Sequence, residues 1–233
     1  MSGRAQAEFD RYRDTYEQTV DDAIGFVGQE HAFYVEAKAR RLLELARRRL
    51  PGRELAALDV GCGPGLTDER LVGQVGSLHG VDVAEPMVER AREAVPGAMY
   101  DVYDGTRLPF EDASFDLTFA ICVLHHVEPP DRAALVGELG RVTRPDGLVA
   151  VFEHNPLNPL TRRVVRNCEF DEGVELLGRR ELTGLFARAG LDPLDVEYLL
   201  FFPWRGRVFA ALEHVLRSLP LGAQYVVAGR PRA

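Results

Sequence analysis

The sequence between residues 55 and 154 alternates short apolar segments with amphipathic ones, and this alternation leaves few folds open to the chain. The apolar segments have the length of strands, and the amphipathic segments have the period of helices. Strands that alternate with helices form a parallel sheet with helices on both faces. The predicted strands are 55–60, 78–83, 98–104, 115–124 and 148–154. One predicted helix begins near residue 66, and two others span 86–95 and 131–143. A turn at 144–147 is expected to end the last of these helices.

The two ends of the chain lack this regular alternation. Residues 1–50 are predicted to form an N-terminal helical cap, and residues 51–233 a core with a capping insert around 155–178, where Asn-Pro pairs signal turns. The apolar stripe of a helix over 206–219 is interpreted as core or dimer packing. The elements expected in these regions are helices at 9–20, 31–50, 179–190 and 206–219 and a closing pair of strands at 194–202 and 223–230.

A glycine-rich loop, Asp59-Val-Gly-Cys-Gly-Pro-Gly65, joins the first predicted strand to the next helix. A backbone without side chains lets a ligand approach closely, and the following helix directs its N–H groups at that ligand. The loop has no lysine, so it is not a phosphate-binding P-loop. The dinucleotide pattern G-x-G-x-x-G would need glycine at position 66 or 68, where Leu66 and Asp68 stand, and this spacing disfavours a nicotinamide oxidoreductase.

The loop resembles the first motif of class I S-adenosylmethionine (SAM)-dependent methyltransferases, and four further motifs follow in the order of that family. They are VDVAEPMVERAR (81–92), YDGTRLPFEDASFDL (103–117), AICVLHHV (120–127) and RVTRPDGLVAV (141–151). The resemblance covers residues 55–154 and is closest to the ubiquinone/menaquinone-biosynthesis type, which acts on small molecules. It implies an α/β fold with a Rossmann-like, mostly parallel seven-stranded sheet, SAM as cofactor and S-adenosylhomocysteine as product.

The same resemblance implies the residues that bind the cofactor. Asp82 would accept both ribose hydroxyls, Val83 would pack on adenine, and Asp104 would accept from the adenine amino group. Asp59 would face the methionine ammonium, although it could instead cap the following helix. Tyr103 and Gly105 stand where the family has glycine and alanine, which is a departure in the local backbone. The full set of implied cofactor residues is Asp59, Gly61, Gly63, Gly65, Asp82, Val83, Asp104, Gly105 and Ile121.

Three histidines fall at the predicted ends of the fourth and fifth strands, where ligands bind in open parallel sheets. His125 and His126 follow the fourth strand, and Glu153-His154 ends the fifth. These histidines are the candidate catalytic residues, with at least one as a general base. The alternative is that each has a structural or positioning role. Tyr12, Tyr16 and Tyr34 are interpreted as helix-packing residues rather than as part of a lid.

Composition excludes several classes of function. The formal net charge is −8, and a negative chain is unsuited to a nucleic-acid partner held through phosphates. The three cysteines show no metal-ligand spacing, so we predict no metal site and reduced thiols in a cytoplasmic protein. No signal peptide and no run of eighteen apolar residues is visible, so stable membrane insertion is not expected. A monomer or a homodimer is expected.

Together these features predict SAM-dependent methyl transfer to a small-molecule acceptor, for example a natural-product intermediate. The alternative is a SAM-binding protein without methyl-transfer activity, such as a regulatory subunit or a repurposed cyclase. The two differ in whether S-adenosylhomocysteine is formed.

Overall fold

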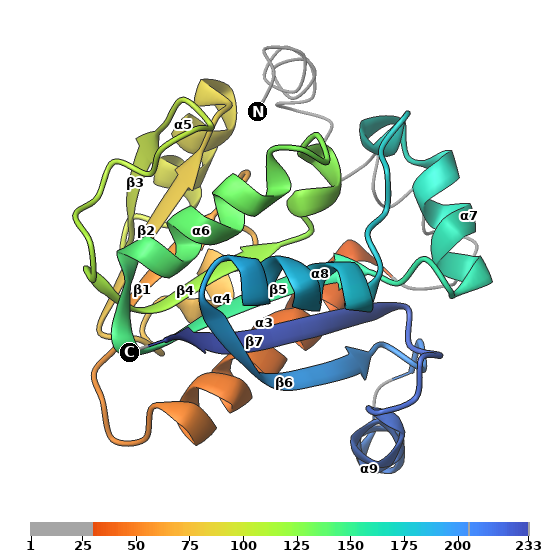
Figure 1. The fold of residues 1–233 in the computed structure, drawn as a ribbon. Coiled ribbons are helices and arrows are strands. Elements are labelled where there is room, and N and C mark those ends of the chain that lie inside the picture. Colours follow the sequence, from red (N-terminus) through yellow and green to blue (C-terminus); the bar gives the residue numbers. More distant parts are fainter. Residues whose placement is uncertain (1–29, 205, 233) are drawn as a thin grey trace.

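The structure, a computed structural model, describes residues 30–204 and 206–232. They contain one seven-stranded sheet in the order β3-β2-β1-β4-β5-β7-β6 (Figure 1). β7 is antiparallel to both neighbours and the other pairs are parallel, which confirms the predicted fold class. The strands are β1 (Ala56–Val60), β2 (Ser77–Asp82), β3 (Met99–Val102), β4 (Phe115–Ile121), β5 (Thr143–His154), β6 (Leu191–Leu199) and β7 (Gln224–Pro231).

Helices cover both faces of the sheet (Figure 1). Along β5, Val149 and Val151 belong to one buried cluster, and Ala150 and Phe152 belong to the other, because successive side chains of a strand point to opposite faces. α6 (Arg132–Val142) and α8 (Arg179–Arg188) complete the first cluster, and α3 (His31–Arg49) completes the second. The remaining helical elements are α4 (Asp68–Leu71), α5 (Glu85–Ala94), η3 (Leu124–His126), α7 (Pro159–Asn167), η4 (Glu169–Asp171) and α9 (Arg207–Leu216).

Two local predictions in the core need correction. The helix after the glycine loop is a single turn, because Val72 is extended and Gly73 has a φ of 77°.

The expected turn at 144–147 lies inside β5 as an irregularity. Phe115 pairs with Thr143, but Leu117 pairs with Leu148, so the extra residues of β5 bulge out between two paired positions.

The region predicted to form an N-terminal helical cap is described only in part. α3 matches the helix expected over 31–50, whereas the helix expected over 9–20, with Tyr12 and Tyr16, lies outside the described residues. α3 ends at a C-cap leucine, Leu50, directly before Pro51-Gly52, as the sequence predicts. Its N-terminal half reaches the carboxyl edge of the sheet, where His31 and Tyr34 line a cavity.

The C-terminal region also differs from one prediction. α9 has no buried residue, and Val208 and Val215 on its apolar stripe are 70% and 72% exposed. Core packing of this helix is therefore a wrong prediction. The reason is that β6 and β7 already have both faces covered, by α8 on one side and by α3 on the other. Dimer packing of the stripe stays a prediction.

Candidate active site

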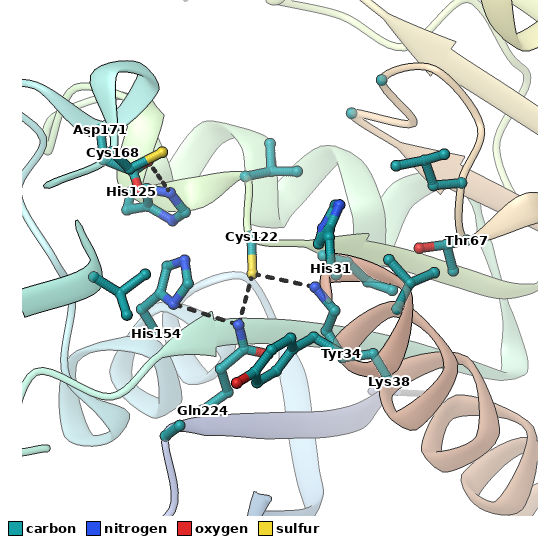
Figure 2. A pocket seen from close by; sticks show the side chains of 18 of the residues that line it. His31, Tyr34, Lys38, Thr67, Cys122, His125, His154, Cys168, Asp171 and Gln224 are labelled. Carbon is teal, nitrogen blue, oxygen red and sulfur yellow. Dashed lines mark hydrogen bonds and ion pairs between the residues drawn. The ribbon is translucent and has the colours of Figure 1, made fainter. Parts of the chain in front are cut away.

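One cavity of about 310 Å³ lies at the carboxyl ends of the parallel strands. The glycine loop and the end of β2 form one end of it, and the ends of β4 and β5 form its floor. α3 and the segment 155–178 close it from the sides, as Figure 2 shows in part. The switch point of the sheet lies between β1 and its neighbour β4, the place where open α/β sheets bind ligands.

The three glycines of the loop have two different structural roles. All three have positive φ. A Cβ on Gly61 would lie 2.5 Å from Val123 Cγ2, and a Cβ on Gly65 would lie too close to Ala91 of α5. Glycine at these two positions therefore lets Val123 and α5 pack closely against the loop backbone. A Cβ on Gly63 would meet nothing within 4 Å, and Gly63 lines the cavity. Gly61 and Gly63 therefore lie at the cavity, whereas Gly65 packs against a helix behind it.

Asp82 fixes the loop from the end of β2. Its Oδ2 accepts from Gly63 N at 2.9 Å and its Oδ1 accepts from Ala84 N at 3.0 Å. Burial raises the pKa of Asp82, although these backbone donors act in the opposite direction. Each carboxylate oxygen keeps a second lone pair, so Asp82 can still accept hydroxyl donors of a ligand. Val83 and Tyr103 line the cavity beside it.

Asp59, at the end of β1, faces a second buried carboxyl from α4. Asp59 Oδ1 and Asp68 Oδ1 are both buried without a hydrogen-bond partner among the described residues, while Tyr100 Oη donates to Asp68 Oδ2 at 2.8 Å. Burial raises the pKa of Asp68 to about 7. Burial, together with the charge of Asp68, holds the pKa of Asp59 well above its usual range. A proton held by one of the two carboxyls relieves the repulsion between them, and a cation brought to Asp59 would take over that role.

Asp104 and Gly105 do not line the cavity in this structure. Asp104 is exposed, and its Oδ1 accepts from Thr106 N and Thr106 Oγ1 at 2.8 and 2.6 Å. These hydrogen bonds lower the pKa of Asp104. Ile121, in contrast, lies on the cavity floor at the end of β4. The implied adenine contact of Asp104 stays a prediction.

Lys38 of α3 reaches the cavity although sequence reasoning did not single it out. It is the only lysine of the chain, and only 6% of it is exposed. Its Nζ points to Cys122 Sγ at 4.0 Å, and Gln224 Nε2 donates to the same sulfur at 3.4 Å (Figure 2). Burial raises the pKa of Cys122, but the charge of Lys38 together with the charge and hydrogen bond of His154 outweighs burial, and the net direction is downward. A lone lysine in a chain rich in arginine was the available signal for this position.

Three candidate histidines come together at the other end of the cavity. The ring of His125 lies 4.1 Å from that of His126 and 5.0 Å from that of His154, measured between centroids. His125 Nδ1 hydrogen-bonds to Glu153 Oε2 at 2.7 Å, and Glu153 Oε1 accepts from Leu124 N at 2.7 Å. The buried Glu153 thus holds the η3 turn and the His125 ring in one orientation.

Asp171, from the segment 155–178, completes this cluster. Its Oδ1 lies 3.4 Å from His125 Nε2 and 3.4 Å from His126 Nε2. Burial lowers the pKa of His125, but Glu153 and Asp171 outweigh it and the pKa is raised well above its ordinary value. Burial, aided by the charge of His125, lowers the pKa of His126 to about 3. The sequence pointed to the segment but not to Asp171, because one aspartate in a loosely patterned region carries no signal.

Comparison with known proteins identifies the family. Residues 58–151 match the family model of the methyltransferase domain named Methyltransf_11. The 27-O-demethylrifamycin SV methyltransferase of Amycolatopsis mediterranei is 31% identical over 206 residues, 81% of this chain and 74% of that protein. The chain therefore belongs to the class I SAM-dependent methyltransferases, and SAM is the cofactor of this family.

Two other matches show how far the likeness extends. An uncharacterized 37.1 kDa transposon protein of Streptomyces fradiae is 33% identical over 144 residues, but the match spans 59% of this chain and only 41% of that protein. A SAM-dependent methyltransferase structure from Thermotoga maritima aligns with a TM-score of 0.68 over 98% of this chain and 100% of that one, at 22% identity. The structural match supports the fold alone.

Proposed function

We propose that this chain transfers a methyl group from SAM to a small molecule of natural-product biosynthesis. The observation that carries the proposal is the single cavity that joins the glycine loop at one end to the histidine cluster at the other. A bisubstrate reaction needs both ligands in one water-poor space, and this cavity offers that space. The similarity to a rifamycin methyltransferase favours a natural-product acceptor.

The cofactor half of the cavity is proposed to hold SAM. The ribose would meet Asp82, adenine would pack on Val83, and the methionine ammonium would meet Asp59. The carboxylate of the same methionine would meet Lys38, since that is the buried cation at this end among the described residues. The loop glycines Gly61 and Gly63, with Ile121 of β4, leave room for the cofactor backbone.

The acceptor half is proposed to hold an apolar molecule with one polar reactive group. Apolar side chains that line it come from α7 and from the segment after β6: Leu160, Val164, Leu200, Phe201, Phe202 and Pro203. The polar groups converge at one place, the cluster of His125, His126 and His154. Such a division, with mostly apolar walls and few placed polar groups, is typical of small-molecule sites. The segment 155–178 would then be part of the acceptor site.

The chemistry needs positioning more than covalent help. The carbon–sulfur bond of the sulfonium breaks while the acceptor bond to carbon forms, and the positive charge on sulfur disappears. Holding the nucleophile, methyl and sulfur in line supplies much of the rate, up to about 7–11 kcal/mol in favourable model reactions. The histidine cluster would hold the acceptor and take part in removing its proton.

The test is formation of S-adenosylhomocysteine. The protein is incubated with SAM and with acceptors that the names of its relatives give, beginning with 27-O-demethylrifamycin SV and 2-methyl-6-phytyl-1,4-hydroquinone, and the product is quantified by mass spectrometry. Acceptor-dependent S-adenosylhomocysteine supports the proposal. Tight binding of S-adenosylhomocysteine without turnover on any of these acceptors would favour a SAM-binding protein that transfers no methyl group.

Location and assembly belong to the same proposal. No helix among the described residues is long and apolar enough to cross a membrane. We propose a cytoplasmic protein that is a monomer or a homodimer without a nucleic-acid partner. The exposed apolar stripe of α9, with Val208 and Val215, is the surface on which a dimer would form. Light scattering of the protein and of a Val215→Glu variant tests the dimer.

A further inference from the structure

Three potential metal ligands converge in the acceptor half of the cavity. His125 comes from η3, His154 from the end of β5, and Asp171 from η4. One donor atom of each lies within 4.8 Å of the donor atoms of the other two. All three side chains line the cavity, and they are drawn together in Figure 2.

When His125 is neutral, its hydrogen bond to Glu153 places the single ring proton on Nδ1, so Nε2 is left as an acceptor. Glu153 is a carboxylate that also accepts from Leu124 N, so Nδ1 of His125 must donate to it at 2.7 Å. Neutral His125 then presents the Nε2 lone pair to Asp171 Oδ1, which is itself an acceptor. Two acceptors that face each other inside a protein need a proton or a cation between them.

The distance between the two atoms is also compatible with a metal cation between them. Charge-assisted hydrogen bonds between nitrogen and a carboxylate are about 2.7–2.9 Å long, whereas His125 Nε2 and Asp171 Oδ1 are 3.4 Å apart. Zinc bonds of about 2.0–2.1 Å to nitrogen and oxygen give a tetrahedron with edges of about 3.3–3.4 Å. Octahedral coordination at the same bond length has shorter edges, of about 2.9 Å, so the pair fits a tetrahedral ion better.

The third donor within reach is His154, whose ring edge points toward His125 (Figure 2). Its Nδ1 lies 3.3 Å from Gln224 Nε2, and Gln224 Oε1 is buried with no hydrogen-bond partner among the described residues. A half-turn of the Gln224 amide lets this oxygen accept from Nδ1–H of His154, in exchange for the hydrogen bond that Gln224 Nε2 donates to Cys122 Sγ. That arrangement frees Nε2 of His154 for a metal, and Gln224 then orients His154 as Glu153 orients His125.

We propose that His125, His154 and Asp171 bind a divalent transition metal of the zinc type, with the fourth position open to the acceptor. Two histidines and one carboxylate with an open fourth position are the ligand set of catalytic zinc sites. His126 lies beside the site as part of the cavity wall, since it does not belong to the three residues whose donor atoms are mutually within reach. The spacing of ligands along the chain gives no metal motif, because they come from three separate segments.

This inference rests on the proposed function for its second half, which concerns the acceptor. A hydroxyl oxygen at the open position would lose its proton more readily, since a bound zinc ion lowers the pKa of an oxygen ligand. The proton leaves to solvent, the oxygen–carbon bond forms as the carbon–sulfur bond of SAM breaks, and the electron pair of that bond stays on sulfur. The acceptor class is therefore a hydroxylated small molecule, and the product is its methyl ether.

Metal binding is tested without any acceptor. The full chain is stripped with a chelator and titrated with Zn²⁺ by calorimetry, and with Co²⁺ by visible absorption, which is strong for tetrahedral coordination. We expect one equivalent of each. Asp171→Asn, which preserves shape, and His154→Ala should lose saturable binding, and Glu153→Gln should weaken it about 10–100-fold as an outer partner. His79→Ala is the matched control, because His79 also contacts a carboxylate, Asp101, at 2.7 Å but lies outside the cavity.

The outcomes separate this inference from the proposed function. Absence of saturable Zn²⁺ binding in the wild-type chain, or equal binding by Asp171→Asn and His154→Ala variants that are folded by circular dichroism, overturns the metal site. If the same amount of S-adenosylhomocysteine forms before and after chelation, the metal has no role in holding the acceptor. The proposed methyl transfer is not affected by that result. One equivalent of Zn²⁺ that the ligand variants lose, with no turnover of SAM, supports the site and overturns the proposed function.

Discussion

The two ends of the cavity are built in different ways. The cofactor end is formed mainly by backbone groups and carboxylates. Gly63 N–H donates a hydrogen bond to Asp82, and the carboxyl of Asp59 lies close to that of Asp68. At the acceptor end, side chains hold other side chains, as Glu153 holds His125. A backbone-built site tolerates little change in shape, whereas a site of paired side chains can change its chemistry one residue at a time. This contrast predicts that damage at one end leaves the other intact.

The largest expected effect comes from Gly63→Val. The new side chain would project into the cavity space that the cofactor must occupy, at a φ of 52° that disfavours β-branched residues. We expect loss of measurable S-adenosylhomocysteine binding by calorimetry in a chain that is still folded by circular dichroism. Gly73→Val is the matched control, because Gly73 also has positive φ and open space but lies outside the cavity. Normal binding by Gly63→Val would show that the loop does not face the cofactor.

The next largest effect is expected from the histidines. Replacement of His125, His126 or His154 by alanine should lower kcat by about 10²–10⁴-fold where the lost ring is one that helps to move the acceptor proton. Affinity for S-adenosylhomocysteine should stay close to wild type, because these residues lie at the opposite end of the cavity. Steady-state kinetics with an acceptor that turns over, together with calorimetry, measure both. A variant that changes KM alone would have a positioning role, and wild-type kinetics in all three would remove the acceptor site from this cluster.

Asp82→Ala should have a smaller effect, confined to the cofactor end. A charged acceptor for ligand hydroxyls is lost, which corresponds to about 1.5–3 kcal/mol of binding free energy for S-adenosylhomocysteine. The variant also leaves Gly63 N and Ala84 N without their acceptor, so a lower melting temperature is expected. Asp101→Ala, a change of the same kind on an exposed side chain of β3, serves as the control. Unchanged affinity in Asp82→Ala would mean that the ribose lies elsewhere.

The last expected effect does not concern the ligands but the pH dependence of stability. Burial raises the folded-state pKa of Asp68 from its ordinary 3.8 to about 7. Between these values the folded chain binds more protons than the unfolded chain, so the contribution of this group to stability falls as pH rises from about 4 to 7. The slope is at most about 1.4 kcal/mol per pH unit for one proton. Asp68→Asn should flatten it in urea titrations of the ligand-free protein, and an unaltered slope would contradict the raised pKa.

The same contrast explains what could be predicted from sequence. The strands, the major helices and the loop with Gly61 and Gly63 were predictable, because local period and contiguous motifs determine them. The bulge at 144–147 was not, because it depends on how β5 pairs with β4. The exposed position of α9 was also missed, since its apolar stripe looks the same whether a helix covers a sheet or faces solvent.

At the acceptor end the sequence could supply only part of the site. His125, His126 and His154 were predictable from their places at strand ends. Lys38 and Asp171 were not, because α3 and η4 reach the cavity from segments far away in the chain. Residues brought together by tertiary packing carry no common spacing, so no pattern in the sequence marks them. The outward position of Asp104 likewise depends on the turn that Thr106 stabilises.

A crystal structure of the chain with S-adenosylhomocysteine would show whether one cavity joins a cofactor end to an acceptor end. We expect ribose hydroxyls on Asp82 and a sulfur atom directed toward His125 and His154. A ligand whose sulfur points away from these histidines, or whose ribose lies at the segment 155–178, would contradict this expectation.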